Sequence, residues 1–323
     1  MKKIPLIPII IIFFLQSVQT GQAYTIEGKH PYDYEQLITD LNGLKQEYCN
    51  TLTIEQIGQS HLGKPIWAVH LGRGEKNILL VGAHHGREWI TSNLLMMMLE
   101  HYANAYTNNI RVGWFEPSIL DKVSIWFVPM LNPDGISIQQ GKIPENMREK
   151  ITSFNDGSTN YHRWKANGVG IDLNRQYPAG WSTVPSPSKP FYKFYKGKQP
   201  LEAKEVQALV QFVKKIKPQA AITYHSSGRE IFWRYGNHQN IFRDFQIGQK
   251  LSFYTGYPLA TPPKNATGGG FTDWFIAAFN RPSFTLELCD FQGETNPPIA
   301  QLHEEWERNQ YIGFVLAEEA EKF

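Results

Sequence analysis

Apolar residues along the chain follow two different spacings. A spacing of about three to four residues, typical of helices with one buried face, predicts helices over residues 33–48, 91–106 and 200–216 and a terminal helix from about Ile299. Apolar runs and alternating patterns predict strands over residues 53–60, 65–72, 77–83, 123–130, 219–224 and 283–288. Long apolar strands separated by helices favour a three-layer α/β/α sandwich with a mixed, mostly parallel, twisted sheet.

Polar motifs stand at the ends of these predicted strands. The stretch GAHHGREWI, residues 82–90, comes at the end of the strand over 77–83, and YHSS, residues 224–227, comes at the end of the strand over 219–224. In open α/β sheets, ligands bind beyond the carboxyl ends of the strands. We therefore expect the functional site at this edge of the sheet.

The first residues have the pattern of a secretory signal peptide. Lys2 and Lys3 precede an apolar run over residues 4–15, and small residues lead up to Ala23. An uncleaved membrane anchor is the alternative, but the run is shorter than the ~20 residues that span a bilayer. We therefore expect cleavage after Ala23, export into the medium, the cell wall or the periplasm, and no membrane attachment afterwards.

Composition and charge narrow the class of protein. The 323 residues carry a net charge of +2 and no basic stripe interleaved with aromatics, so we expect no nucleic-acid partner. Two cysteines, Cys49 and Cys289, are too few for a disulfide scaffold or a thiolate metal cluster, and a single bridge between them stays open. After the signal peptide over 1–23, residues 24–323 show no repeat or linker and are expected to form a single catalytic domain.

Two histidines and one glutamate stand at the ends of predicted strands. His85 and Glu88 are three residues apart, so both can turn toward one cation. His225 comes at the end of another predicted strand and can reach the same edge of the sheet. This ligand set leaves a fourth tetrahedral position for water, as in catalytic rather than structural zinc sites. The first pair alone is a weak signal, because His85 could instead pack or cap a helix.

A metal site that activates water also needs a base. Glu287 stands near the carboxyl end of the strand over 283–288, where an unpaired acid is hard to explain as part of a core. Glu287 argues against a zinc- or peptide-binding module without activity, because such a module has no use for a base. A serine hydrolase built on Ser226 or Ser227 is disfavoured, since neither serine lies in a G-x-S-x-G turn.

The segment RWKANGVGIDLNRQYP, residues 163–178, gathers charged and amide side chains around a glycine turn. An arginine beside an asparagine suits a carboxylate ligand, because a guanidinium offers paired donors and the amide adds one more. A solvated basic loop is the alternative. The candidate residues of this segment are Arg163, Lys165, Asp172, Asn174 and Arg175.

Six motifs together resemble the zinc metallocarboxypeptidase family typified by carboxypeptidase A, in the same order along the chain. They are HHGREW, NPDG, GIDLNRQYP, YHSS, GGGFTDW and SFTLELCD, and the resemblance spans roughly residues 30 to 320. It implies one Zn²⁺ per chain, bound by His85, Glu88 and His225. It also implies that Glu287 is the general base and that Asp172 orients a zinc-bound histidine.

The resemblance extends to the residues that would bind substrate. Asn174 and Arg175 match the pair that holds the terminal carboxylate. Lys165 stands where carboxypeptidase A-like enzymes have the arginine that polarises the scissile carbonyl. The single charge of an ammonium group therefore replaces the paired N–H donors of a guanidinium. Arg163, two residues away, is a further candidate for substrate binding. His84 matches no ligand, and we expect it at the rim of the pocket.

Two further departures from the family pattern concern specificity. Asn265 stands where the digestive enzymes have their mobile tyrosine, and Tyr257 is too far upstream to be assumed to replace it. Thr272 stands at the floor of the specificity pocket, where it is neither a large aliphatic residue nor an acid. A small polar floor leaves room for a side chain with a polar end, such as diaminopimelate.

The pattern W-K-A-N-x-x-G-[VI]-D-L-N is similar to that of bacterial γ-D-glutamyl-diaminopimelate endopeptidases, family members that cut peptidoglycan stem peptides. We therefore expect a monomeric enzyme that hydrolyses the γ-D-glutamyl–diaminopimelate (diamino acid) amide bond and whose partner is a peptide or muropeptide substrate. The alternative is a general exported metallocarboxypeptidase that removes C-terminal amino acids from peptides.

Overall fold

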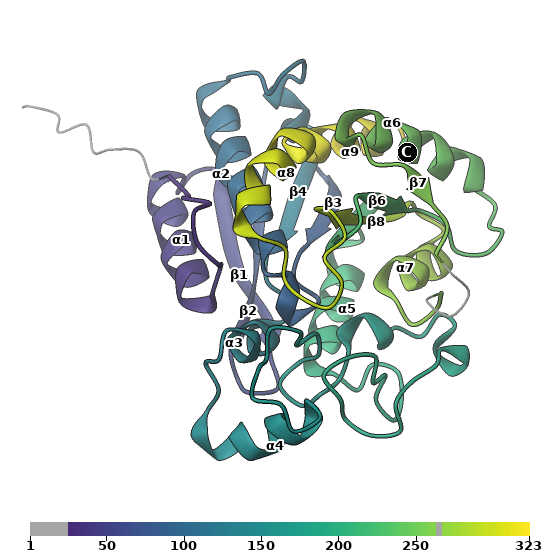
Figure 1. The fold of residues 1–323 in the computed structure, drawn as a ribbon. Helices are drawn as coiled ribbons and strands as arrows, with labels where there is room; N and C mark the ends of the chain where they lie inside the picture. Colours follow the sequence, from purple (N-terminus) through teal and green to yellow (C-terminus); the bar gives the residue numbers. More distant parts are fainter. Residues whose placement is uncertain (1–24, 263–266) are drawn as a thin grey trace, which may run out of the picture.

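The computed structural model describes residues 25–262 and 267–323 (Figure 1). The predicted signal peptide and Asn265 lie outside these residues. The described chain forms an eight-stranded sheet in the order β1-β2-β4-β3-β5-β8-β6-β7. The strands are β1 (Leu52–Gln59), β2 (Pro65–Leu71), β3 (Lys76–Val81), β4 (Val123–Val128), β5 (Ala220–Ser226), β6 (Glu230–Phe232), β7 (Leu259–Ala260) and β8 (Ser283–Leu288).

The sheet is mixed, with parallel strands at its centre. Strands β4, β3, β5 and β8 run parallel to their neighbours in this order, while β1, β2 and β4 pair antiparallel, as do β8 and β6. The parallel centre brings the carboxyl ends of β3, β5 and β8 to one edge of the sheet. The predicted strand ends therefore meet at one edge of the sheet, where the functional site was expected.

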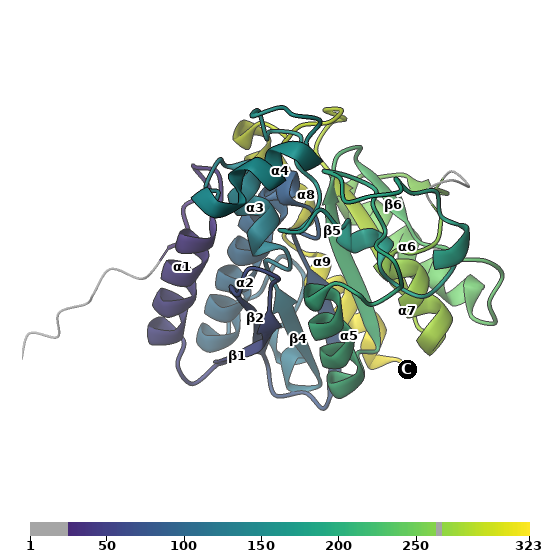
Figure 2. The same ribbon diagram turned by 90° about the horizontal axis from the view of Figure 1, so that it is seen from below.

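Helices cover both faces of the sheet, which confirms the predicted three-layer sandwich (Figures 1 and 2). One core contains residues of α1, α2, α6, α8 and α9, and the other contains residues of α5 and α7. The helices are α1 (Tyr34–Glu47), α2 (Ile90–Asn108), α3 (Pro133–Gln139), α4 (Arg148–Phe154), α5 (Lys204–Ile216), α6 (Ile241–Thr255), α7 (Phe271–Phe279), α8 (Leu302–Asn309) and α9 (Ile312–Glu321).

Strand β3 shows how the apolar pattern produces the two cores. Ile78 and Leu80 pack into one core, and Leu79 and Val81 pack into the other. Successive side chains of a strand point to opposite faces, so a continuous apolar run buries both. The strand that leads to His85 is thereby held between two helical layers.

Helix α1 follows from its sequence in a similar way. The Asp33 side chain caps it by accepting a hydrogen bond from the Gln36 backbone N–H at 2.7 Å. Leu37, Leu41 and Leu44 recur at helical spacing and are all buried in the first core. The predicted helix over 33–48 is confirmed.

Some predicted boundaries differ from the structure. Strand β5 extends to Ser226, so His225 belongs to the strand itself. Helix α5 begins only at Lys204, four residues later than predicted. The predicted terminal helix is divided into α8 and α9, and this change of direction lays the apolar residues of α9 against β3 and β4. Among the described residues, no helix combines the length and apolar character needed to cross a bilayer.

Both cysteines carry free thiols in this fold. Cys49 is exposed after α1, whereas Cys289 is fully buried after β8, where burial raises the pKa of its thiol. We expect one equivalent of thiol to react with Ellman's reagent in the native protein and a second only after denaturation, because the thiolate is the reactive form. Cys49→Ser should remove the reactive thiol of the native protein. Native protein without any reactive thiol would contradict this assignment.

Candidate active site

A contact between two glycines positions the loop that follows β3. A Cβ atom on Gly86 would lie 2.3 Å from the carbonyl oxygen of Gly135, so the two backbones can approach only without side chains. The buried Asn132 side chain donates to the carbonyl oxygens of His84 at 3.0 Å and Ala166 at 3.1 Å. The NPDG motif therefore ties the loop of the predicted metal ligands to the loop that carries Lys165.

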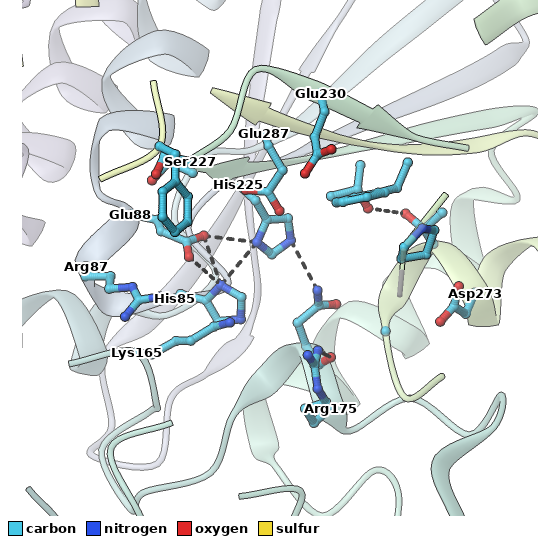
Figure 3. A pocket seen from close by; sticks show the side chains of 18 of the residues that line it. His85, Arg87, Glu88, Lys165, Arg175, His225, Ser227, Glu230, Asp273 and Glu287 are labelled. Atoms are coloured by element: carbon cyan, nitrogen blue, oxygen red, sulfur yellow. Dashed lines mark hydrogen bonds and ion pairs between the residues drawn. The ribbon is translucent and has the colours of Figure 1, made fainter. Parts of the chain in front are cut away.

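The three predicted metal ligands converge at the carboxyl edge of the sheet (Figure 3). His85 precedes the short helix η1 (Gly86–Glu88), Glu88 ends it, and His225 is the penultimate residue of β5. Their candidate ligand atoms all lie within 4.8 Å of one another, and all three side chains are buried. Glu88 carboxylate oxygens lie 2.9 Å from Nδ1 of His85 and 3.0 Å from Nδ1 of His225.

This donor set fits a zinc ion. The Nδ1 atoms of His85 and His225 face each other at 3.1 Å, and only a proton or a metal ion between them makes such an approach favourable. Burial alone would raise the pKa of Glu88, but His85 and His225 hold that pKa well below its usual range. Two imidazole nitrogens and a carboxylate are ligands that zinc prefers, and they leave a position open.

Asp172 supports His85 from behind. Its Oδ1 lies 3.1 Å from Nε2 of His85 and accepts a hydrogen bond from the Asn174 backbone N–H at 3.1 Å. Burial would raise the pKa of Asp172, but Lys165 and His85 hold that pKa well below its usual range. A carboxylate on Nε2 keeps the proton there and leaves the Nδ1 lone pair free for a metal. The predicted orienting role of Asp172 agrees with this geometry.

Glu287 lines the same pocket from β8. In the parallel pairing of β5 with β8, Glu287 is the register partner of His225, and Figure 3 shows its carboxylate directed toward the metal ligands. Burial raises the pKa of Glu287 to about 8, and the carboxylate of Glu88 contributes to this shift. A carboxyl group with a pKa near neutrality can both accept and return a proton, which is what a general base requires.

Lys165 also reaches the pocket. Its Nζ lies 3.9 Å from Oδ2 of Asp172 and 5.0 Å from the ring centroid of Phe194. Burial lowers the pKa of Lys165, and Asp172 opposes this shift. A cation held beside His85 is placed to stabilise negative charge that develops near the metal.

Asn174 and Arg175 lie on a short helical turn and both line the pocket. Figure 3 labels Arg175 below the metal ligands. The Asn174 side chain accepts a hydrogen bond from the Phe271 backbone N–H at 3.0 Å, which fixes its amide. One Arg175 nitrogen donates to the Asn174 carbonyl oxygen at 2.8 Å. A guanidinium has five N–H donors, so Arg175 can still bind a carboxylate that enters the pocket.

The predicted floor residue, Thr272, is in the pocket and is buried. Its hydroxyl lies 2.8 Å from the hydroxyl of Thr285, which lies 3.2 Å from that of Thr223. Neighbouring Asp273 accepts a hydrogen bond from the Gly268 backbone N–H at 2.6 Å, and burial raises its pKa to about 6. The floor is therefore polar and hydrogen-bonded.

Two predicted residues lie elsewhere. The guanidinium of Arg163 does not line the pocket, because it donates to the side chain and backbone of Asn155 at 3.0 and 2.9 Å and stacks over Tyr192 at 3.9 Å. His84 is completely buried rather than at the pocket rim, with Nε2 at 3.0 Å from the Tyr177 hydroxyl. Arg163 is thus engaged within the protein, whereas His84 bonds through one ring nitrogen and its Nδ1 has no hydrogen-bond partner among the described residues.

Several pocket residues were not predicted, and five of them have large side chains. They are Arg87, Glu230, Phe232, Arg234 and Phe291. The first stands next to the predicted ligands, so its position in HHGREW was an available signal. The alternation of Glu230, Phe232 and Arg234 fits one face of a strand, but only the pairing of β6 with β8 shows that this face lines the pocket.

Comparisons with known proteins agree with this geometry. Residues 37–312 match the model of the Peptidase_M14 family, zinc carboxypeptidases. The gamma-D-glutamyl-L-diamino acid endopeptidase 1 of Lysinibacillus sphaericus is 32% identical over 283 residues, which cover 85% of this chain and 69% of that protein. Metallocarboxypeptidase A of Arthroderma otae is 31% identical over 290 residues, which cover 81% of this chain and 64% of that protein.

The fold has close counterparts among solved structures. Bovine thrombin-activatable fibrinolysis inhibitor, solved in complex with tick carboxypeptidase inhibitor, superposes with a TM-score of 0.76 at 18% sequence identity. The superposition covers 91% of this chain and 99% of that chain. With the convergent ligand set and the family match over most of its length, the chain belongs to the zinc carboxypeptidase family and is a zinc-dependent metallopeptidase.

Proposed function

We propose that the protein is exported and hydrolyses the γ-D-glutamyl–diamino acid amide bond of peptidoglycan stem peptides, with one zinc ion per chain. The observation that carries the substrate assignment is the polar wall of the pocket. Thr272 and Thr285 form its hydrogen-bonded floor, and Glu230 and Asp273 add carboxyl groups. An apolar side chain would gain nothing from these polar groups, whereas a diamino acid can hydrogen-bond to them.

The similarity to a gamma-D-glutamyl-L-diamino acid endopeptidase supports the same substrate class. Lys165 is consistent with a γ-D-glutamyl–diamino acid substrate, because the sequence pattern around this residue is similar to that of γ-D-glutamyl-diaminopimelate endopeptidases. The basic residues and the apolar run of the first 23 positions support export, as peptidoglycan lies outside the cytoplasm.

The described residues can divide the chemistry among them. His85, Glu88 and His225 would hold the zinc ion, which would supply a Lewis acid and lower the pKa of a water molecule. Glu287 accepts a proton from the attacking water and returns it to the leaving amine. Lys165 stabilises the negative charge on the carbonyl oxygen. Asn174 and Arg175 hold the free carboxylate of the leaving residue and so align the scissile bond.

A general exported metallocarboxypeptidase is the second candidate function. The similarity to metallocarboxypeptidase A of Arthroderma otae favours it. Asn174 and Arg175 suit any substrate with a free terminal carboxylate, so they serve both candidates equally. The polar floor is what separates the two, because a pocket for apolar C-terminal residues gains nothing from threonine hydroxyls.

A product assay tests the proposal. Purified protein is incubated with L-Ala-γ-D-Glu-diaminopimelate and, separately, with blocked dipeptides that end in an apolar or a basic residue, each with and without chelator. We expect release of diaminopimelate that the chelator abolishes. Cleavage of the blocked dipeptides alone would refute the cell-wall substrate and establish the general carboxypeptidase.

A further inference from the structure

Glu230 is a pocket carboxylate without a role in the steps described above. It is the first residue of β6, it lines the pocket together with Glu287, and it is half-buried. Within residues 25–262 and 267–323, no hydrogen bond or ion pair engages its carboxylate. It also stands outside the group of side chains that converge as metal ligands. A carboxylate so placed faces the pocket without a counter-ion from the described protein.

The pairing of β6 with β8 sets Glu230 directly opposite Glu287. Residues directly opposite each other in an antiparallel pair point to the same face, with Cβ atoms about 4.5–5.5 Å apart. Figure 3 shows both carboxylates directed into the pocket. Like charges in this arrangement repel each other. A cation that bound beside Glu230 would relieve this repulsion.

The described basic side chains of the pocket are engaged elsewhere or lie away from Glu230. Arg234 donates to the Gly236 carbonyl oxygen at 3.1 Å and to the Asn237 side chain. Lys165 lies near Asp172. Figure 3 shows Arg87 on the far side of the metal ligands from Glu230, and Arg175 on the opposite side of the pocket. The cation that Glu230 can bind therefore has to enter with the substrate.

The surroundings of Glu230 indicate which part of the substrate brings this cation. Phe232, two residues further along the same strand face, also lines the pocket and offers its ring to a methylene chain. Thr285 is the register partner of Phe232 on β8, and its hydroxyl lies 2.8 Å from that of Thr272. A carboxylate, an aromatic wall and a polar floor together suit an aliphatic side chain that ends in an ammonium group.

We propose that Glu230 is a specificity-determining residue that binds the side-chain ammonium of the residue released from the substrate. Lysine, ornithine and diaminopimelate share this ammonium, and norleucine has the same aliphatic chain without it. The choice of γ-D-glutamyl substrates for the test rests on the proposed function, but the ammonium contact would serve a general carboxypeptidase equally.

The test compares two substrates that differ only in this ammonium, L-Ala-γ-D-Glu-L-Lys and L-Ala-γ-D-Glu-L-norleucine. The quantity measured is the ratio of kcat/KM for lysine to kcat/KM for norleucine, in zinc-loaded wild-type protein and in Glu230→Gln. We expect wild type to prefer lysine and Glu230→Gln to lower the ratio about tenfold or more, mainly through KM for the lysine substrate. Glu149→Gln removes the same charge from the exposed surface of α4 and should keep the wild-type ratio.

Two outcomes would overturn the proposal. Wild type could show no preference for lysine, or the ratio could stay the same in Glu230→Gln. An unchanged ratio with both substrates slowed equally would mean that Glu230 acts only through Glu287. If Glu230→Gln does not fold or retain zinc, Glu230→Asp decides, because it keeps the charge and should keep a preference for lysine over norleucine.

A failure of the proposed function would be seen separately. If neither γ-D-glutamyl peptide is cleaved, the same ratio is measured with blocked ordinary dipeptides that end in lysine or norleucine. A ratio that depends on Glu230 there would uphold the ammonium contact while refuting the cell-wall substrate.

Discussion

Glu287→Gln is expected to lower kcat/KM by about a thousandfold or more while the protein keeps its zinc. A positioned general base typically contributes about 10²–10⁴-fold, and Glu287 is the carboxyl group of β8 that faces the metal ligands. It is not among the three converging ligand residues, so its amide should leave the zinc content unchanged. The measurement combines steady-state kinetics with metal analysis after dialysis. Loss of zinc together with activity would instead make Glu287 a ligand.

The same variant has a second consequence, for the stability of metal-free protein. The pKa of Glu287 is raised to about 8 in the fold from an ordinary value of 4.5. Folded protein therefore binds this proton more tightly than unfolded protein does. The resulting stabilisation is complete below pH 4.5 and is lost as the pH rises through about 8.

Glutamine does not titrate, so Glu287→Gln should lose less stability than wild type over this pH range. We expect the Tm of the metal-free variant, relative to metal-free wild type, to be higher at pH 9 than at pH 5 by a few degrees. Glu149→Gln, an exposed change on α4, should show no such difference. Equal Tm differences at both pH values would contradict a raised pKa.

The metal ligands were predictable because strand pattern and residue type act together. His85 and His225 each stand at the carboxyl end of a strong apolar run, and parallel strands bring such ends to one edge. His85 and Glu88 are only three residues apart, so a single helical turn is enough to direct both side chains toward one metal ion. These relations are local or follow from the sheet, so the sequence is sufficient to predict them.

For the loop over residues 163–178, the sequence did not predict which side chains enter the pocket. This loop contains both Arg163 and Arg175, and only Arg175 lines the pocket. Arg163 is drawn away by Asn155 and Tyr192, which are not neighbours that spacing could identify. The backbone here is irregular, so no periodicity states which face a side chain occupies.

Glu230 was missed for a related reason. Strand β6 contains three residues, too few for a reliable alternation, and its place beside β8 depends on the order of the whole sheet. Its pairing with Glu287 is a contact between different strands. The specificity of the pocket therefore depends on tertiary structure more than the metal site does.

His225→Ala should abolish stoichiometric zinc binding and with it the activity. The remaining ligands would be His85 and Glu88, three residues apart in sequence, and the third ligand, on β5, would be lost. We expect zinc affinity to fall by at least about a hundredfold and activity by about a thousandfold or more, because the metal contributes several kcal/mol of transition-state stabilisation. His303→Ala, an exposed histidine of α8, is the matched control and should behave as wild type.

Any zinc that remains in His225→Ala has an identifiable source. The ring of His84 stacks on that of His225 at 5.2 Å, and its Nδ1 is buried without a hydrogen-bond partner among the described residues. Removal of the His225 ring opens space into which this nitrogen could turn. If His84 substitutes as a ligand, the double variant His84→Ala/His225→Ala should lose the residual zinc that His225→Ala retains. Wild-type protein without zinc after dialysis, together with unchanged activity in His225→Ala, would refute the metal site altogether.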